Sequence, residues 1–197
     1  MDSPNNQKVK EYSPPYEPRI QFTYEDLLEF PDDGKHYEII DGELFMSPSP
    51  LTWHQRASVN LAFIISKYIR EHQLGELFFA PLDVLLSESN VVEPDLLFIL
   101  NENSHIITKE NIKGVPDFLI EILSPSNRRY DVKKKRALYE RYGVKEYWLV
   151  DPDLENIQKF ILKEGNYVDC GTFEENTTIT CDVIQGLSFE VKEVFIV

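Results

Sequence analysis

The sequence predicts an α/β fold, because short apolar runs typical of strands alternate with two amphipathic helical segments. The longer helical segment spans Thr52–Gln73, and the second spans Tyr130–Tyr142 and is stopped by Gly143. The runs Val91–Leu100 and Phe118–Leu123 are short and strongly apolar, as expected for strands buried in a sheet. With 197 residues, of which 42% are hydrophobic and 27% charged, the chain is long enough for one domain with a sizeable core.

The first residues, 1–18, are polar and rich in proline, which predicts a disordered N-terminal arm ahead of a single domain at 19–197. The arm contains no apolar stretch of the kind found in signal peptides or membrane spans. We therefore expect a cytoplasmic protein without a membrane partner.

The segment Lys35–Met46 predicts a hairpin around the two-residue turn Asp41-Gly42. Pairing across this turn places Tyr37, Ile39, Leu44 and Met46 on one face, which we expect to be the core face. Glu38 lies on the other face, and the pattern leaves open whether that acidic face is solvated or functional.

On the Thr52–Gln73 helix, an apolar stripe is formed by Ala57, Leu61, Ile64, Ile65 and Tyr68. His54 lies on the first turn of the same stripe, so it is either a core histidine with a hydrogen bond or an accessory site residue. The next apolar segment, Leu77–Leu86, predicts a strand in which Pro81 indicates an edge or a bulge.

Two carboxylates interrupt the most apolar strands of the chain. Asp95 follows Pro94 in one run, and Glu121 lies within the other. Desolvating a carboxylate is costly unless it is paired, protonated or bound to a cation. Carboxylates on neighbouring strands, with carbonyls and waters, are the hard oxygen ligands that Mg²⁺ or Mn²⁺ requires. Asp117 also precedes Glu121, but four residues of extended chain separate them by about 13 Å, so we expect it to cap the strand entrance.

The Tyr130–Tyr142 helix carries one lysine on its apolar side. At about 100° per residue, Lys135 falls within the apolar stripe, and Asp131 lies one turn earlier on the same line. The stripe consists of Val132, Leu138, Tyr139 and Tyr142. An alternative to a functional role is a buried Asp131–Lys135 ion pair. The outward basic residues form a candidate nucleic-acid-binding patch, which comprises Arg128, Arg129, Lys133 and Lys134.

The sequence pattern of the C-terminal part predicts mainly β-strands. Ile157–Leu162 and Tyr167–Phe173 predict a further hairpin, and alternation at Leu187, Phe189 and Val191 predicts a half-buried strand. Cys170 and Cys181 have no metal-ligand partners at useful spacing, so we expect free thiols. This end could cover the sheet or form a homodimer contact.

These features resemble the restriction-endonuclease-like, or PD-(D/E)XK, superfamily and, more narrowly, the Uma-two group. The resemblance covers roughly Tyr24 to Phe195. It rests on Tyr37–Leu44, His54-Gln55, Glu93–Leu96, Glu121–Ser126, Asp131 with Lys135, and Tyr147–Pro152.

The resemblance implies a mixed central β-sheet flanked by α-helices, to which the C-terminal hairpin strands are an addition. It implies that Asp95 and Glu121 hold the metal and that Glu38 is an accessory catalytic acid. The superfamily places its lysine two residues after the glutamate, but Leu123 occupies that position here. Lys135, selected independently by the helical wheel, takes its place in this interpretation.

The implied activity is endonucleolytic hydrolysis of DNA by a metal-activated water, with Mg²⁺ or Mn²⁺ as cofactor. The charge argues against tight DNA binding, because 34 acidic residues outnumber 20 basic ones and give a net charge of -14. DNA binding is therefore expected to be weak or confined to the basic patch. Two alternatives stay open: a catalytically silent nuclease-fold module that binds nucleic acid or a protein, and a metal-free hydrolase using paired carboxylates as acid and base.

Overall fold

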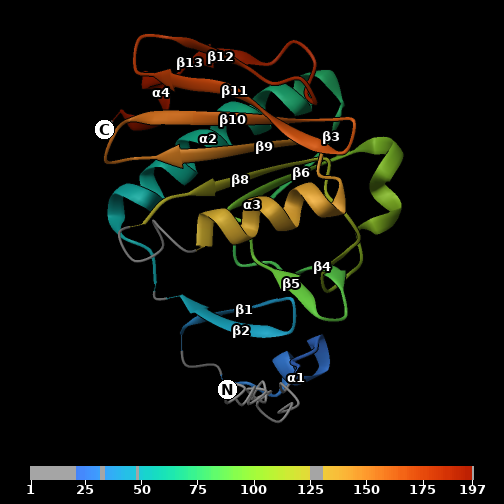
Figure 1. The fold of residues 1–197 in the computed structure, drawn as a ribbon. Helices are drawn as coiled ribbons and strands as arrows, with labels where there is room; N and C mark the ends of the chain where they lie inside the picture. The colour runs from blue at the N-terminus through green and yellow to red at the C-terminus, as the bar shows by residue number, and fades with distance from the viewer. Residues whose placement is uncertain (1–20, 32–33, 48, 125–130, 197) are drawn as a thin grey trace, which may run out of the picture.

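The computed structural model describes residues 21–31, 34–47, 49–124 and 131–196 (Figure 1). The predicted N-terminal arm at 1–18 lies outside the described residues. Within those residues, no helix is long and apolar enough to cross a membrane.

A six-stranded mixed sheet forms the centre of the fold, in the order β11-β10-β9-β8-β6-β3. Only β8 and β9 run parallel among its neighbouring strands, and helix α3 (Asp131–Tyr142) connects them. The mixed sheet implied by the resemblance is thus confirmed. The strands are β3 (Gly75–Phe79), β6 (Leu96–Leu100), β8 (Phe118–Ile122), β9 (Glu146–Asp151), β10 (Asn156–Lys163) and β11 (Asn166–Glu174).

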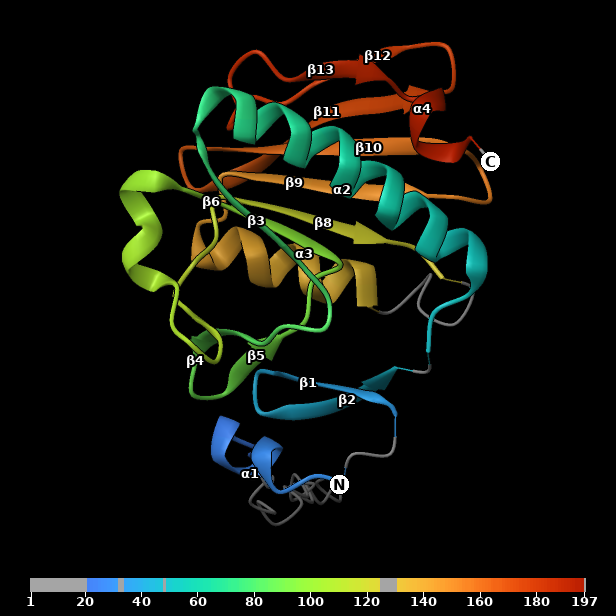
Figure 2. The same ribbon diagram turned by 180° about the vertical axis from the view of Figure 1, so that it is seen from behind.

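A second sheet, in the order β2-β1-β5-β4-β7, lies beyond α3 in both ribbon views (Figures 1 and 2). The short helix α1 (Tyr24–Leu28) packs beside its β1–β2 hairpin, and the 3₁₀ helix η1 (Asn101–Ile106) follows β6. Its strands are β1 (His36–Ile40), β2 (Glu43–Ser47), β4 (Val84–Ser87), β5 (Asn90–Val92) and β7 (Ile112–Lys113).

Different elements pack on the two faces of the central sheet. Helix α2 (Thr52–His72) and the C-terminal elements β12 (Thr178–Thr180), β13 (Ser188–Glu190) and α4 (Lys192–Phe195) cover one face. Helix α3 and the second sheet cover the other. Strand alternation produces this division, because Phe118 and Ile120 on β8 pack toward α2 whereas Leu119 packs toward α3. Glu121 therefore lies on the α3 side.

Several elements match their prediction closely. Helices α2 and α3 occupy the predicted segments, and Gly143 takes a left-handed φ of 88° after α3. The β10–β11 hairpin and the strand around Phe189 are also confirmed. Cys170 is exposed, Cys181 is buried, and both are free thiols.

Two predicted strands are each divided in the structure, and a proline lies at each division. Val91–Leu100 splits into β5 and β6, which belong to different sheets, with Pro94 between them. Leu77–Leu86 likewise splits at Pro81 into β3 and β4. Proline has no N–H to donate to a sheet, so the chain leaves one sheet and enters the other at these points.

The β1–β2 hairpin has the predicted turn, because Asp41 and Gly42 have φ values of 52° and 75°, as a type I′ turn requires. The predicted core face was wrong in part, since Met46 is 57% exposed whereas Glu38 and Ile40 are buried. The reason is that both faces of β1 are covered. Ile40 packs into the core near α3, while Tyr37 stacks on Phe30 with ring centroids 5.1 Å apart.

Candidate active site

A cavity of about 300 Å³ lies where β8, the start of β6, α3, the β1–β2 hairpin and the first turn of α2 meet. Its ionisable lining residues are His36, Glu38, His54, Glu93, Asp95, Glu121 and Lys135. A larger cavity of about 550 Å³ lies between α1 and β4, but its lining includes none of these residues. The convergence of seven ionisable groups makes the smaller cavity the candidate site.

Glu121 on β8 and Lys135 on α3 form the floor of the cavity. The Lys135 Nζ lies 3.2 Å from each carboxylate oxygen of Glu121, and only 8% of the lysine side chain is exposed. Tyr139, one turn further along α3, donates its hydroxyl hydrogen to Glu121 Oε1 at 2.5 Å. Helical spacing places both donors on the face of α3 that covers β8.

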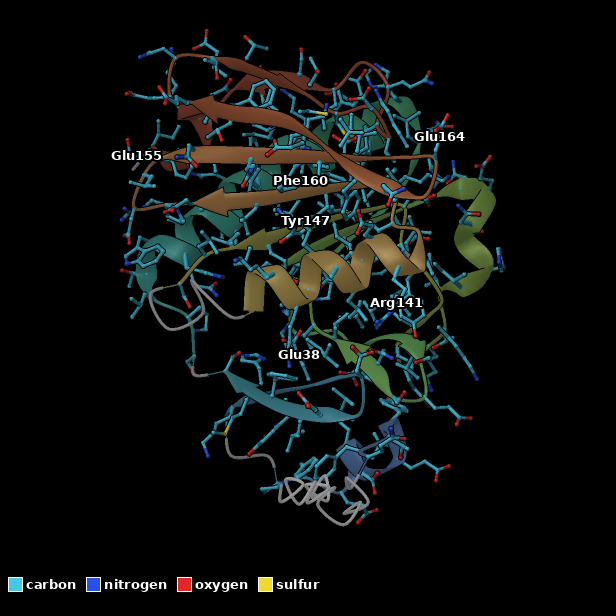
Figure 3. All side chains as sticks on the ribbon, in the orientation of Figure 1. Glu38, Arg141, Tyr147, Glu155, Phe160 and Glu164 are labelled. Carbon is cyan, nitrogen blue, oxygen red and sulfur yellow. The ribbon has the colours of Figure 1, made fainter. Side chains whose placement is uncertain are left out.

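Glu38 reaches this pair from the second sheet, and Figure 3 labels it between the hairpin and α3. Its Oε1 lies 2.8 Å from Lys135 Nζ and accepts a 2.7 Å hydrogen bond from the Glu93 backbone N–H. Glu38 is therefore buried in the site, whereas Glu43 on the same face of the hairpin is exposed, and the alternative that Glu38 is merely solvated is wrong.

Asp95 lies directly before β6, beside the end of β8. Its Oδ2 accepts a 2.7 Å hydrogen bond from the Ile122 backbone N–H and lies 3.3 Å from His54 Nε2. Both contacts use Oδ2, and Oδ1 makes no contact of this kind within the described residues. Asp95 and Glu121 line the same cavity, and the charge of Asp95 contributes to raising the pKa of Glu121.

The electrostatics of the site are dominated by buried acids. Burial raises the pKa of Glu121 to about 8; Lys135 opposes this shift, whereas Asp95 and Glu38 reinforce it. Burial, together with Glu121 and Glu38, also raises the pKa of Tyr139 well above its ordinary value. Tyr139 therefore stays protonated and acts as a hydrogen-bond donor.

The donor chemistry fits a hard divalent cation. Three carboxylates, those of Glu38, Asp95 and Glu121, line the cavity with one lysine, so the ionised cluster has an excess of negative charge. No ready-made group of three His, Cys, Asp or Glu ligands exists among the described residues. Mg²⁺ does not need one, because it usually keeps several waters and uses one or two carboxylates. Asp95 and Glu121 could provide these two.

The structure brings together four predicted catalytic residues, Glu38, Asp95, Glu121 and Lys135, and it places the predicted accessory His54 beside them. Lys133 is exposed on α3, as predicted, whereas Lys134 is half-buried and pairs with Glu43 at 2.8 Å.

The side chains of three predicted site residues lie outside the part of the chain that the structure describes. Arg128 and Arg129 lie outside the described residues, as does the side chain of Asp131. The proposed Asp131–Lys135 pair stays a prediction for this reason.

Asp117 lies at the opposite end of β8 and has a structural environment. Its carboxylate accepts hydrogen bonds from the Leu100 backbone N–H at 2.9 Å and from Asn103 at 2.7 Å, and it pairs with Lys145 at 2.7 Å. These contacts tie the ends of β6 and β8 to η1, in agreement with the expected capping role.

Sequence reasoning missed three residues of the site. Tyr139 was assigned to the apolar stripe of α3, although its position four residues after Lys135 could have shown that both face β8. His36 and Glu93 were missed because they lie 57 positions apart in sequence and meet only when β1 pairs with β5. No local pattern reveals that contact.

Known proteins resemble this chain in sequence and in fold. A family model described as "Uma2: Putative restriction endonuclease" matches residues 24–192. A solved structure from Anabaena variabilis, described as "a putative nuclease belonging to DUF820", is 20% identical, with a TM-score of 0.74 over 88% of this chain and 97% of that one. No curated protein matches the chain. Because the family model covers most of the sequence, the chain belongs to the Uma2 family.

Proposed function

We propose that this member of the Uma2 family is a metal-dependent endonuclease that hydrolyses phosphodiester bonds of DNA. One observation carries the proposal: Lys135, supplied by a helix, reaches Glu121 at 3.2 Å inside a cavity that Asp95 also lines. An acid pair with a lysine is the set of groups that such hydrolysis needs, although here the lysine comes from α3 and not from the strand.

Each residue of the site has its own role in the proposed reaction. Asp95 and Glu121 would hold Mg²⁺ or Mn²⁺, which would supply Lewis acidity when bound. Lys135 orients the attacking water and stabilises charge that develops on the phosphate. Glu38 fixes the Lys135 ammonium, and Tyr139 fixes the Glu121 carboxylate, so that neither group has to reorganise during the reaction.

Access of DNA depends on local charge. The chain carries a net charge of -14, so the phosphate backbone is repelled by most of the surface. Lys133 is exposed on the same helix as Lys135 and is the described residue that we propose attracts phosphate. Lys134 contributes less in this proposal, because Glu43 pairs with it.

The decisive experiment is cleavage of plasmid and single-stranded DNA with Mg²⁺ or Mn²⁺ by the wild type and by Asp95→Asn, Glu121→Gln and Lys135→Met. These near-isosteric changes remove the charge with little change in volume. Lys109→Met, which changes an exposed lysine that does not line the cavity, is the matched control. We expect the wild type and the control to cut, and the three folded site variants to lose cleavage by 10²-fold or more, roughly.

A specific observation favours one second candidate, a catalytically silent binding module. Without metal, the pKa of about 8 keeps Glu121 largely protonated at neutral pH, so Lys135 and Glu38 can serve as a structural ion pair. In that case the wild type would not cut with either metal, and the three site variants would bind DNA as the wild type does. Equal cutting by the wild type and the site variants would contradict the proposed site.

A further inference from the structure

His36 and Glu93 form a second ionisable pair in the same cavity, and the proposed function gives neither a role. His36 Nδ1 lies 2.7 Å from Glu93 Oε2. Both residues line the cavity together with Glu121 and Lys135. The His36 side chain is 33% exposed, whereas that of Glu93 is only 15% exposed.

The backbone next to this carboxylate is anchored, and the carboxylate itself is largely buried. The backbone N–H of Glu93 donates to Glu38 Oε1 at 2.7 Å, and the Glu93 side chain is only 15% exposed. A carboxylate fixed in this way, bound to one ring nitrogen of a histidine, sets the orientation and tautomer of the imidazole. With Nδ1 directed at Glu93, the remaining ring nitrogen, Nε2, is the one available to a substrate.

The position of His36 relative to the floor of the cavity suggests a role. His36 and Glu38 are two residues apart on β1, so their side chains share one face at a separation of about 7 Å along the strand. Glu38 contacts Lys135 at the floor, where the side chains are 5% and 8% exposed, whereas the more exposed His36 lies toward the mouth. In phosphoryl transfer, the attacking and leaving oxygens lie roughly in line on opposite sides of phosphorus. A water at Lys135 would therefore leave the departing oxygen nearer His36.

We propose that His36 is a further catalytic residue, the general acid that protonates the leaving sugar oxygen, and that Glu93 positions it. The bond from water oxygen to phosphorus forms, and the bond from phosphorus to the sugar oxygen breaks. The Nε2 proton of the His36 imidazolium passes to that oxygen, which leaves a neutral ring with its Nδ1 proton on Glu93, and solvent then returns a proton to Nε2. The proton lost by the attacking water goes to solvent, so protons and charge balance. This inference rests on the proposed nuclease function.

A leaving group that needs no proton provides the test. One DNA substrate carries the ordinary phosphodiester, and a second has sulfur in place of the leaving sugar oxygen, which is first identified from the ends of the wild-type products. We expect His36→Ala to lower kcat/KM for the oxygen substrate by about 10²- to 10⁴-fold, the usual contribution of an acid catalyst. For the sulfur substrate, the loss should be far smaller.

Two further variants separate catalysis from structure. His36→Gln keeps a polar group beside Glu93 but cannot deliver a proton, so it should match His36→Ala. His105→Ala removes an exposed histidine that does not line this cavity and should match the wild type on both substrates. Equal losses on the oxygen and sulfur substrates for His36→Ala and His36→Gln would overturn the acid role while leaving the nuclease function intact. A wild type that cuts neither substrate would overturn both proposals.

Discussion

Lys135 Nζ on α3 lies 3.2 Å from both carboxylate oxygens of Glu121 on β8, and Glu38 holds the same ammonium at 2.8 Å from the other side. One cation thus joins the central sheet to the second sheet through a helix. Since a buried ion pair is costly to break but contributes little net stability when intact, this arrangement is better explained by the chemistry of the site than by stability.

The link between Lys135 and Glu38 predicts that their substitutions are coupled. Lys135→Met should destabilise the fold by about 3–5 kcal/mol, because it leaves the Glu38 charge buried without its cation. Adding Glu38→Gln should recover much of that loss without restoring DNA cleavage. Urea unfolding at pH 7 measures the stabilities. A double variant as unstable as Lys135→Met alone would show that Glu38 does not depend on Lys135.

The raised pKa of Glu121 predicts a stability that falls with pH in the absence of metal. The folded-state pKa is about 8, against an ordinary value of 4.5, so the folded state binds the proton more tightly than the unfolded chain does. The resulting stabilisation is complete below pH 4.5 and is lost as the pH rises through 8. Above pH 8, the protonation of Glu121 no longer stabilises the folded state.

Glu121→Gln isolates this effect, because glutamine resembles the protonated acid and does not titrate. Its gain in unfolding free energy over the wild type should grow between pH 4.5 and 8 and then level off. Denaturant unfolding in a chelator at several pH values measures this gain. A difference between variant and wild type that does not change with pH would contradict the raised pKa.

The contact between His54 and Asp95 predicts a role in metal affinity. His54 Nε2 lies 3.3 Å from Asp95 Oδ2, and its buried Nδ1 has no hydrogen-bond partner among the described residues. A proton on Nδ1 would be unsatisfied, so the neutral ring donates from Nε2 and orients the carboxylate. His54→Phe should weaken Mn²⁺ binding by about 10- to 100-fold, measured by calorimetry. Arg56→Ala, an exposed neighbour on α2, is the control, and unchanged affinity in His54→Phe would contradict this role.

Much of this site could be predicted from the sequence because it follows from two periodicities. Alternation on β8 directs Glu121 to the side opposite Phe118 and Ile120, and the wheel of α3 turns Lys135 toward the same place. The position of Glu38 could not be predicted in this way, because its burial depends on β1 pairing with β5 and packing against α3. The pairing of His36 with Glu93 depends on the same long-range contact.

Prolines account for the errors in the strands. Val91–Leu100 has the composition of one strand, and only the change of sheet at Pro94 shows that Asp95 directly precedes a new one. That break is useful to the site, because it leaves Asp95 outside the ladder of β6, where its carboxylate can accept the Ile122 N–H.

A second buried network, remote from the cavity lining, predicts where the fold itself is most sensitive. Lys159 on β10 is buried and contacts Glu146, Asp182 and the Thr180 carbonyl, and Glu146 accepts the backbone N–H groups of Asp182 and Val183 at 2.8 and 2.9 Å. This network attaches the C-terminal segment to the central sheet. Lys159→Met should therefore destabilise the protein by about 3–5 kcal/mol, since it leaves the buried Glu146 carboxylate without its cation.

An exposed lysine in the same C-terminal region provides the comparison. Lys192 pairs with Glu190 at the surface, where both side chains are about half exposed, so Lys192→Met should leave the unfolding midpoint almost unchanged. Guanidinium unfolding of both variants measures the contrast. If Lys159→Met were as stable as Lys192→Met, the buried contacts of Lys159 would not be what holds the C-terminal segment on the sheet.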